Sequence, residues 1–296
     1  MSLLPLAAFI LGSYAGIQWI RVCPRIAFVP VLTLTLGVFV AMKRYAFVPA
    51  SLWLPPTFAT IGLSYILFRV LHLMVDTRAG AIENRIGLFS YLQYTANFAT
   101  LASGPIQLYP DFERTSQSAM KFRLSAATAA LAFERIVRGL FKTNVLALLF
   151  SVFHTRLIDS LTVTQPNALF AALALCCYPL FLFCNFSGYI DIVIAAGQLL
   201  GLQFPENFVR PFSSGNFLDF WTFGWHITLS SWLRNYVYNP LLIGLMRAFP
   251  SRALELVFAV FAYFVTFFLV GAWHGPTREF LFYGLLLGLG VSLNKA

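Results

Sequence analysis

Long apolar runs alternate with short polar stretches along nearly the whole chain. Several of these runs approach the roughly 20 residues that an α-helix needs to cross a bilayer. Hydrophobic residues therefore predict the following membrane segments: 2–20, 26–42, 52–75, 88–108, 126–153, 167–186, 188–202, 217–246, 254–272 and 279–293. Polar loops are expected at 77–87, 109–123 and 203–216. No basic residue precedes Arg21, so the first run is interpreted as a retained helix and not as a cleavable signal peptide.

Some of these segments are predicted to be irregular. Segment 88–108 contains Gln93, Asn97 and the sequence Ser103-Gly-Pro105, which favours a broken or re-entrant element packed inside protein. Only a short polar motif, with Asn185, Ser187 and Gly188, separates segments 167–186 and 188–202. They could form one long kinked helix, or a helix followed by a half-helix.

The composition supports this picture. Of the 296 residues, 59% are hydrophobic and 10% are charged, whereas a soluble domain has roughly 45–50% apolar and about 25% charged residues. A soluble chain of this size could not bury so much apolar surface. We therefore predict an all-α, polytopic integral membrane protein of roughly 8–10 helical segments, some of them broken. It is predicted to form a single membrane domain over residues 1–296.

The charge of the chain is +9, from 20 Lys and Arg against 11 Asp and Glu. Most basic residues lie between apolar runs, among them Lys43, where they can hold helix ends at an anionic headgroup surface. The predicted partner is therefore the lipid bilayer and not a nucleic acid. The four cysteines contain no C-x-x-C motif, so neither a metal site nor a disulfide framework is expected.

Ionisable residues inside membrane segments are costly and are candidates for function. His226 lies in segment 217–246, and if that segment is helical, five residues share one face of it: Asp219, Phe223, His226, Ser230 and Arg234. Such a stripe should line a bundle interior or a water-filled cavity. Alternatively, the tryptophans and arginine form an interfacial belt and His226 makes one interhelical hydrogen bond.

His274 lies between Trp273 and Gly275-Pro276, directly after a strongly apolar run. An imidazole at such a helix break has the chemistry of a general base near neutral pH, although the same pattern also fits an ordinary interfacial turn. His72 and His154 stand near segment ends and are expected to be interfacial. A further cluster, Asn185 to Asp191, places a phenol and a carboxylate in an apolar stretch. Glu134 and Arg138 can pair on a helix that lies along the interface.

Several of these motifs, taken in order, resemble the membrane-bound O-acyltransferase family, in particular its bacterial branch for alginate O-acetylation and lipoteichoic-acid D-alanylation. The resemblance covers about residues 55–290, and the following motifs carry it: Leu101–Phe112 with its Gly-Pro-Ile, Phe186–Asp191, Pro205–Phe212, Phe220–Tyr238 and Trp273-His-Gly275. Asn235 stands where many members of this branch have Asp, and Thr222 and Phe223 replace a usual basic pair. The chain is also shorter than typical members.

The resemblance implies a helical bundle around a central cavity or tunnel, and transfer of an acyl group from a thioester to an acceptor hydroxyl. His274 and His226 match the family's two signature histidines, so His274 is expected to be the general base and His226 to orient substrate or stabilise the oxyanion. Polar parts of the substrates would be held by the following residues: Arg234, Asn207, Arg210, Ser230, Tyr189 and Asp191. No bound cofactor or metal is expected, because the thioester, on coenzyme A or an acyl carrier protein, is a substrate. The resemblance further implies a bacterial cytoplasmic membrane, a carrier protein and periplasmic partner proteins.

Other functions fit parts of the pattern. A transporter or channel could use the polar stripe as a substrate path, although no internal repeat is found in the sequence. Two intramembrane histidines could also ligate a haem. Finally, the chain could be an assembly subunit of an envelope-modification complex whose histidines no longer act.

Overall fold

The computed structural model describes residues 3–49, 51, 53, 62–163 and 167–295. The chain divides into two compact units, Met1–Tyr109 with Phe208–Ala296, and Pro110–Asn207. Each unit is described by itself below. The described residues are helical and contain no β-strand, which confirms the predicted all-α fold class.

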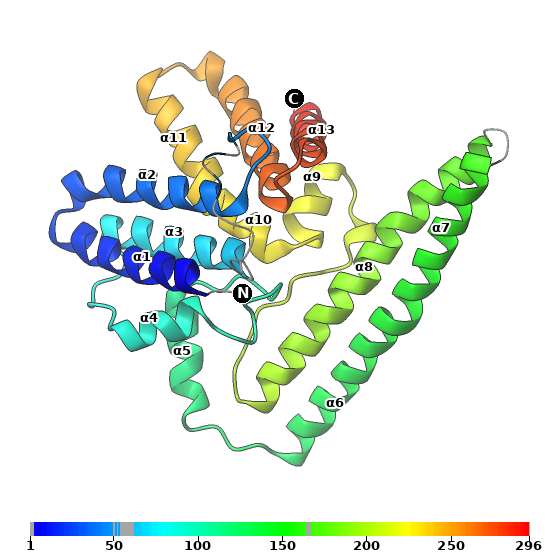
Figure 1. The fold of residues 1–296 in the computed structure, drawn as a ribbon, viewed down its shortest axis with the longest axis horizontal. Helices are drawn as coiled ribbons and strands as arrows, with labels where there is room; N and C mark the ends of the chain where they lie inside the picture. Colours follow the sequence, from blue (N-terminus) through cyan, green and yellow to red (C-terminus); the bar gives the residue numbers. More distant parts are fainter. Residues whose placement is uncertain (1–2, 50, 52, 54–61, 164–166, 296) are drawn as a thin grey trace. The chain divides into compact units, whose positions relative to one another are not determined.

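The first unit is built from helices at both ends of the chain (Figure 1). Its α-helices are α1 Leu4–Val22, α2 Pro24–Lys43, α3 Leu63–Ala79, α4 Leu88–Thr95, α9 Phe217–Asp219, α10 Ile227–Leu233, α11 Asn239–Ala248, α12 Glu255–His274 and α13 Arg278–Lys295. Single π-helical turns, Phe220–Gly224 and Arg234–Tyr238, flank α10. Helices α1, α2 and α3 pack on one another, and α12 packs along α13.

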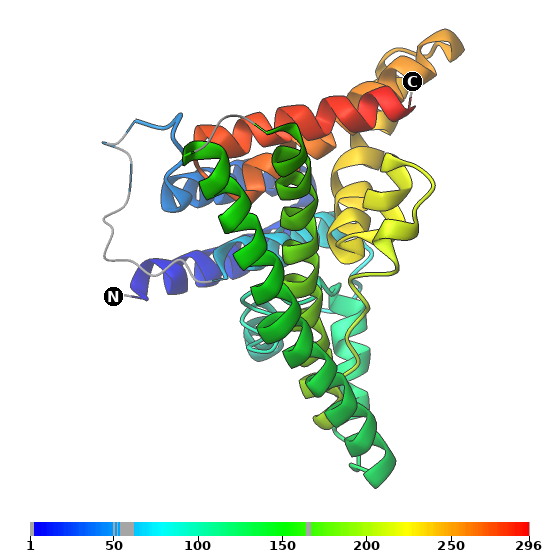
Figure 2. The ribbon, with the colours of Figure 1, turned by 90° about the vertical axis from the view of Figure 1, so that its right-hand side faces the viewer.

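The second unit is a long helical hairpin with one preceding helix. Its elements are α5 Tyr109–Ala119, α6 Ala126–Phe141, a π-helical turn Lys142–Leu146, α7 Ala147–Val163 and α8 Ala168–Leu199. Helices α6 and α7 form one continuous rod that lies along α8, as Figures 1 and 2 both show. The side chains of Ser125 and Asn167 accept hydrogen bonds from the first turns of α6 and α8, which fixes where these helices begin.

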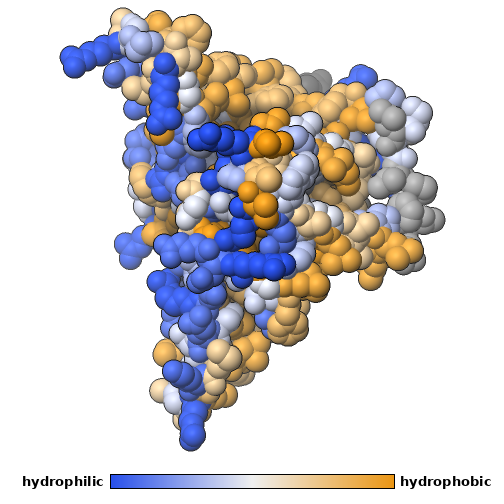
Figure 3. Space-filling model, turned by 90° about the vertical axis from the view of Figure 1, so that its left-hand side faces the viewer, coloured by the Kyte–Doolittle hydropathy of each residue, from blue (hydrophilic) through white to orange (hydrophobic). Residues whose placement is uncertain are grey.

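Among the described residues, four helical stretches are long and apolar enough to cross a membrane: Pro24–Lys43, Ala126–Val163, Ala168–Leu199 and Arg252–His274. Many large hydrophobic side chains remain exposed, and Figure 3 shows hydrophobic residues over much of the visible surface. A soluble protein would not expose so much apolar surface. This is the arrangement of an integral membrane protein.

The structure resolves the irregular segments. Segment 88–108 is broken, as predicted, because α4 ends at Thr95 and irregular backbone follows. One helix, α8 Ala168–Leu199, with Pro179 inside it, covers nearly all of both segments, so the single-helix alternative is correct. The predicted loop at 109–123 is wrong over most of its length, since Tyr109–Ala119 is helical. Residues 52 and 54–61 of predicted segment 52–75 lie outside the described residues.

Helices α6 and α8 approach closely at a pair of glycines. A Cβ on Gly139 would lie 2.6 Å from the carbonyl oxygen of Gly188, and a Cβ on Gly188 would lie 2.7 Å from that of Gly139. Next to this crossing, the Asp191 carboxylate accepts hydrogen bonds from Arg135 Nε (3.0 Å) and Lys142 Nζ (2.8 Å). The glycines allow backbone contact, and the ion pairs fix its register.

Two cations of α6 have further acidic neighbours. Arg138 Nε lies 3.6 Å from Asp191, although the sequence suggested Glu134 as its partner. Arg135 also donates to Glu206 (2.6 Å), in the chain segment that follows α8. The ion cluster therefore links α6, α8 and this segment within the second unit.

His72 is buried inside the first unit, whereas the sequence analysis expected it to be interfacial. Its side chain is 0% exposed, with Nδ1 lying 2.6 Å from the Tyr236 hydroxyl and 3.0 Å from an Asp76 carboxylate oxygen. The backbone N–H of Tyr109 donates to Nε2 (2.9 Å), and Tyr236 donates to Asp76 (3.0 Å). Both ring nitrogens are satisfied, which makes His72 a polar link between α3 and the π-helical turn that contains Tyr236.

Replacement of His72 by Leu should lower the free energy of unfolding by about 2–4 kcal/mol, because the buried Tyr109 amide would lose its partner and the half-buried Tyr236 hydroxyl and Asp76 carboxylate would each lose one of theirs. The matched control is His154→Leu, since His154 is half-buried and its ring packs against Tyr178. Denaturant titration in detergent measures both variants. Equal stability of the two would contradict this account of His72.

Gly188→Ala should destabilise the protein by about 1–3 kcal/mol, because the new methyl group meets backbone that cannot rotate away. Gly244→Ala is the control: it lies inside α11 with open space around it, where Ala favours the helix by up to about 1 kcal/mol. The two substitutions should thus have opposite signs in thermal unfolding, and a shared sign would refute the role assigned to the glycine crossing.

Candidate active site

The core of the first unit joins the two segments that carry His226 and His274. Buried aromatic and aliphatic side chains from α3, α10, α12, α13 and the irregular segment before α5 form one cluster: Tyr65, Phe68, Ile106, Leu229, Trp232, Leu233, Phe267, Val270, Leu287 and Val291. Helices α12 and α13 meet at Gly271 and Gly284, where a Cβ on either residue would overlap the backbone of the other helix. The core therefore holds α10 and α12 against each other.

The helical conformation is interrupted between the first π-helical turn and α10, and the candidate site lies at this break. Gly224 ends the turn, Trp225 is extended, and His226 adopts a left-handed conformation with φ 49° and ψ 50°. Few non-glycine residues adopt this conformation, and those that do cluster at functional sites. The predicted continuous stripe is therefore wrong N-terminal to His226: Phe223 is 61% exposed, and the Asp219 carboxylate accepts a hydrogen bond from Asn216, the residue that caps α9.

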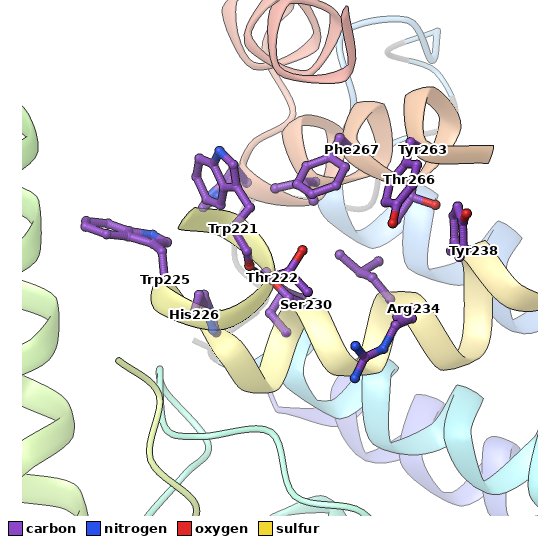
Figure 4. A pocket seen from close by; sticks show the side chains of 14 residues that line it. Trp221, Thr222, Trp225, His226, Ser230, Arg234, Tyr238, Tyr263, Thr266 and Phe267 are labelled. Atoms are coloured by element: carbon purple, nitrogen blue, oxygen red, sulfur yellow. Dashed lines mark hydrogen bonds between the residues drawn. The ribbon is translucent and has the colours of Figure 1, made fainter. Parts of the chain in front are cut away.

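Both imidazoles line one cavity of about 50 Å³. Its walls come from the first π-helical turn, α10, the second π-helical turn and α12, with the following residues: Trp221, Thr222, Trp225, His226, Leu229, Ser230, Leu233, Arg234, Tyr238, Tyr263, Thr266, Phe267, Val270 and His274. Figure 4 shows side chains of the broken segment facing Tyr263, Thr266 and Phe267 of α12. A cavity of this volume is large enough for water or a small reacting group.

Trp273 packs against both histidines. Its ring centroid lies 6.0 Å from that of His226 and 4.6 Å from that of His274. His226 is buried, with 3% of its surface exposed, whereas His274 is exposed at the end of α12. One imidazole thus lies deep in the wall and the other is open to an incoming molecule.

Two side-chain hydroxyls near the break form hydrogen bonds with backbone groups, one in the first π-helical turn and one in the irregular segment after α4. The Ser230 hydroxyl donates to the Trp221 carbonyl (2.6 Å), and the Ile106 N–H donates to the Thr228 hydroxyl (3.0 Å). Irregular backbone at membrane depth needs such partners inside the protein. The second contact also brings the Gly-Pro-Ile motif of residues 104–106 to the segment that carries His226.

Some of the predicted site residues line the cavity and the others do not. His226, His274, Ser230 and Arg234 line the cavity together. Arg210 belongs to the same unit but is exposed and absent from the cavity wall. The remaining three residues belong to the second unit: Tyr189, Asp191 and Asn207.

The sequence analysis missed the wall that α12 contributes. Five residues share one face of α12, because they are spaced at i, i+3, i+4, i+7 and i+11: Tyr263, Thr266, Phe267, Val270 and His274. Counting back from His274 would have found them. Within the described part of the chain, no group of three or more His, Cys, Asp or Glu side chains is arranged to hold a metal ion.

Comparison with known proteins identifies the class. Residues 31–296 match the membrane-bound O-acyltransferase family, MBOAT. With this match over most of its length and two histidines on one cavity, the chain belongs to the membrane-bound O-acyltransferase family.

Particular relatives are named as enzymes of envelope polymers. The chain is 28% identical over 225 residues to a teichoic acid D-alanyltransferase of Bacillus subtilis, covering 76% of this chain and 56% of that protein. It is 29% identical over 240 residues to the Streptococcus thermophilus protein of the same name, covering 80% and 57%. A probable alginate O-acetylase of Pseudomonas aeruginosa is 28% identical over 240 residues, covering 80% and 42%. The chain thus spans about half the length of the curated relatives it matches.

Gly224→Ala should displace the break that places His226. A Cβ there would lie 2.7 Å from the Cα of Pro211, so backbone has to move, and we expect a loss of about 1–3 kcal/mol of stability. Gly215→Ala is the control, because its Cβ would meet nothing within 4 Å. Thermal unfolding in detergent compares the two, and an unaffected Gly224→Ala protein would show that the close approach is not required.

Proposed function

We propose that this protein transfers an acyl group from a thioester donor to a hydroxyl group of a cell-envelope polymer, at the cytoplasmic membrane of a bacterium. Family membership and the names of the relatives support this reaction class. The observation that carries the proposal is that His226 and His274, from two separate elements, line one cavity. Two imidazoles at one small site can serve a reaction that needs both a base and a group to stabilise charge.

His274 acts as the general base. Its imidazole takes the proton of the acceptor hydroxyl as that oxygen attacks the thioester carbonyl carbon, and the carbonyl oxygen becomes an oxyanion. The C–O double bond then re-forms, the C–S bond breaks, and the proton passes from His274 to the leaving thiolate. An ester and a free thiol result, and no electrons are exchanged with an outside group.

His226 stabilises the oxyanion or orients a substrate from the buried side of the cavity. An N–H donor fixed in a site that excludes water stabilises developing charge without having to reorganise. The apolar wall of Leu229, Leu233 and Phe267 keeps bulk water away from the thioester, which limits hydrolysis. Arg234 and Ser230 lie on the same wall and contact polar parts of the substrates.

The other predicted substrate contacts remain part of the proposal. Arg210, Asn207 and Tyr189 would hold polar groups of donor or acceptor outside the small cavity. Asp191 acts less directly, because its carboxylate already binds Arg135 and Lys142. The thioester is carried by coenzyme A or an acyl carrier protein, and periplasmic partner proteins would present the polymer.

Acyl transfer can be tested directly. Membranes that contain the full chain are incubated with labelled acetyl or D-alanyl thioesters of coenzyme A or of a carrier protein, and with teichoic acid or alginate. Ester-linked label in the polymer is measured by its release with hydroxylamine. His274→Gln should lower the rate about 10²–10⁴-fold, the contribution of a general base, and His226→Gln should lower it as well.

His154→Gln serves as the control, because His154 lies in the second unit and packs against Tyr178. It should retain the wild-type rate. Transfer by the His274→Gln protein at the wild-type rate would disprove the proposed base. Absence of transfer by wild type with every donor and acceptor pair would count against the enzyme and favour an assembly role.

A further inference from the structure

The helix that carries His274 ends without a cap of its own. Helix α12 ends at His274, and Gly275 continues in an extended conformation, with φ −162° and ψ 162°. The last carbonyl groups of a helix have no donors within that helix. In a membrane protein these groups need partners from elsewhere in the chain.

A short segment that begins with the last residue of α2 supplies the partners. Lys43 Nζ donates to the carbonyl of Trp273 (3.1 Å), and the Tyr45 hydroxyl donates to the carbonyl of Ala272 (2.8 Å). The Ala46 N–H donates to the carbonyl of residue 276 (2.8 Å). Residues 43–46, which we call the tether, therefore bind acceptors on both sides of His274.

The tether is itself fixed. Lys43 Nζ also donates to the Ser64 hydroxyl of α3 (2.8 Å), and Tyr45 is buried against the ring of Phe39. Arg44 caps α2 in a left-handed conformation with φ 56°, which turns the chain from the helix into the tether. Helices α2 and α3 thus hold the end of α12 through Lys43.

The charge of Lys43 suits this place. Its ammonium group lies at the carbonyl end of α12, where the helix dipole is negative, and it is also the last residue of its own helix, α2. The sequence analysis interpreted Lys43 as one of many cations that hold helix ends at the headgroups. The contacts with Trp273 and Ser64 assign it a more specific place.

We propose that Lys43 is a positioning residue for His274: with Tyr45 and Ala46 it holds the end of α12 so that the imidazole stays at the cavity. This inference rests on the proposed role of His274 as general base. A reaction that needs a proton transferred between fixed atoms loses about 10²-fold in rate when its groups move by about 1 Å. Loss of the tether should thus affect the chemical step more than substrate binding.

The test compares Lys43→Met, Lys43→Arg and Lys121→Met in the full chain in lipid nanodiscs. Lys43→Met should lower kcat about 10–100-fold and leave KM within about twofold. Lys43→Arg, which keeps a charged donor, should restore most of kcat. Lys121→Met is the control, because Lys121 lies in the second unit and is exposed.

Amide hydrogen exchange tests the tether without an activity assay. In Lys43→Met the amides of Ala46, Gly275 and residues 277–281 should exchange at least about tenfold faster, while those of α7 and α8 should not change. Tyr45→Phe removes one hydroxyl and should produce a smaller change at the same amides. This second variant tests the tether even if Lys43→Met folds poorly.

The outcomes separate the two proposals. Unchanged exchange at these amides together with wild-type kcat in Lys43→Met overturns the tether. A loss of kcat that Lys43→Arg does not restore, with exchange raised throughout the protein, also overturns it, because Lys43 would then serve general stability. Faster local exchange supports the tether even if wild type transfers no acyl group, a result that counts only against the proposed function.

Discussion

The site depends on one constraint: a helix broken inside a membrane protein must find partners for its backbone within the protein. The break before α10 meets this constraint with hydrogen bonds from outside its own turn, such as the one that the Val209 N–H donates to the carbonyl of Gly224. The end of α12 meets it with Lys43 and Tyr45. The same contacts that satisfy the backbone also place both imidazoles, so folding of this region and assembly of the site are one process.

The sequence predicted the long elements well, because period and length of the apolar runs are enough to identify them. It also indicated His226 and His274 as candidate functional residues, since an imidazole among apolar residues has a high desolvation cost. The family resemblance gave both histidines their proposed roles. Its O-acyltransferase class is confirmed by the match over residues 31–296.

The sequence did not predict contacts between segments that are far apart in the chain. A helical wheel through 217–234 extends one stripe across His226, whereas the left-handed conformation of that residue redirects the chain. His72 has the pattern of a residue at a segment end, yet it is buried because Tyr236 and Asp76 provide partners. Period and composition describe one segment at a time, and these features arise from pairs of segments.

The aromatic wall of the cavity has a spectroscopic consequence. The chain has six tryptophans, and four of them lie in or beside the site: Trp221 and Trp225 line the cavity, Trp232 belongs to the adjoining core, and Trp273 packs on both imidazoles. The intrinsic emission of the protein therefore comes largely from indoles around one small volume. Any molecule that enters it alters their surroundings, so the protein contains its own fluorescent reporter of site occupancy.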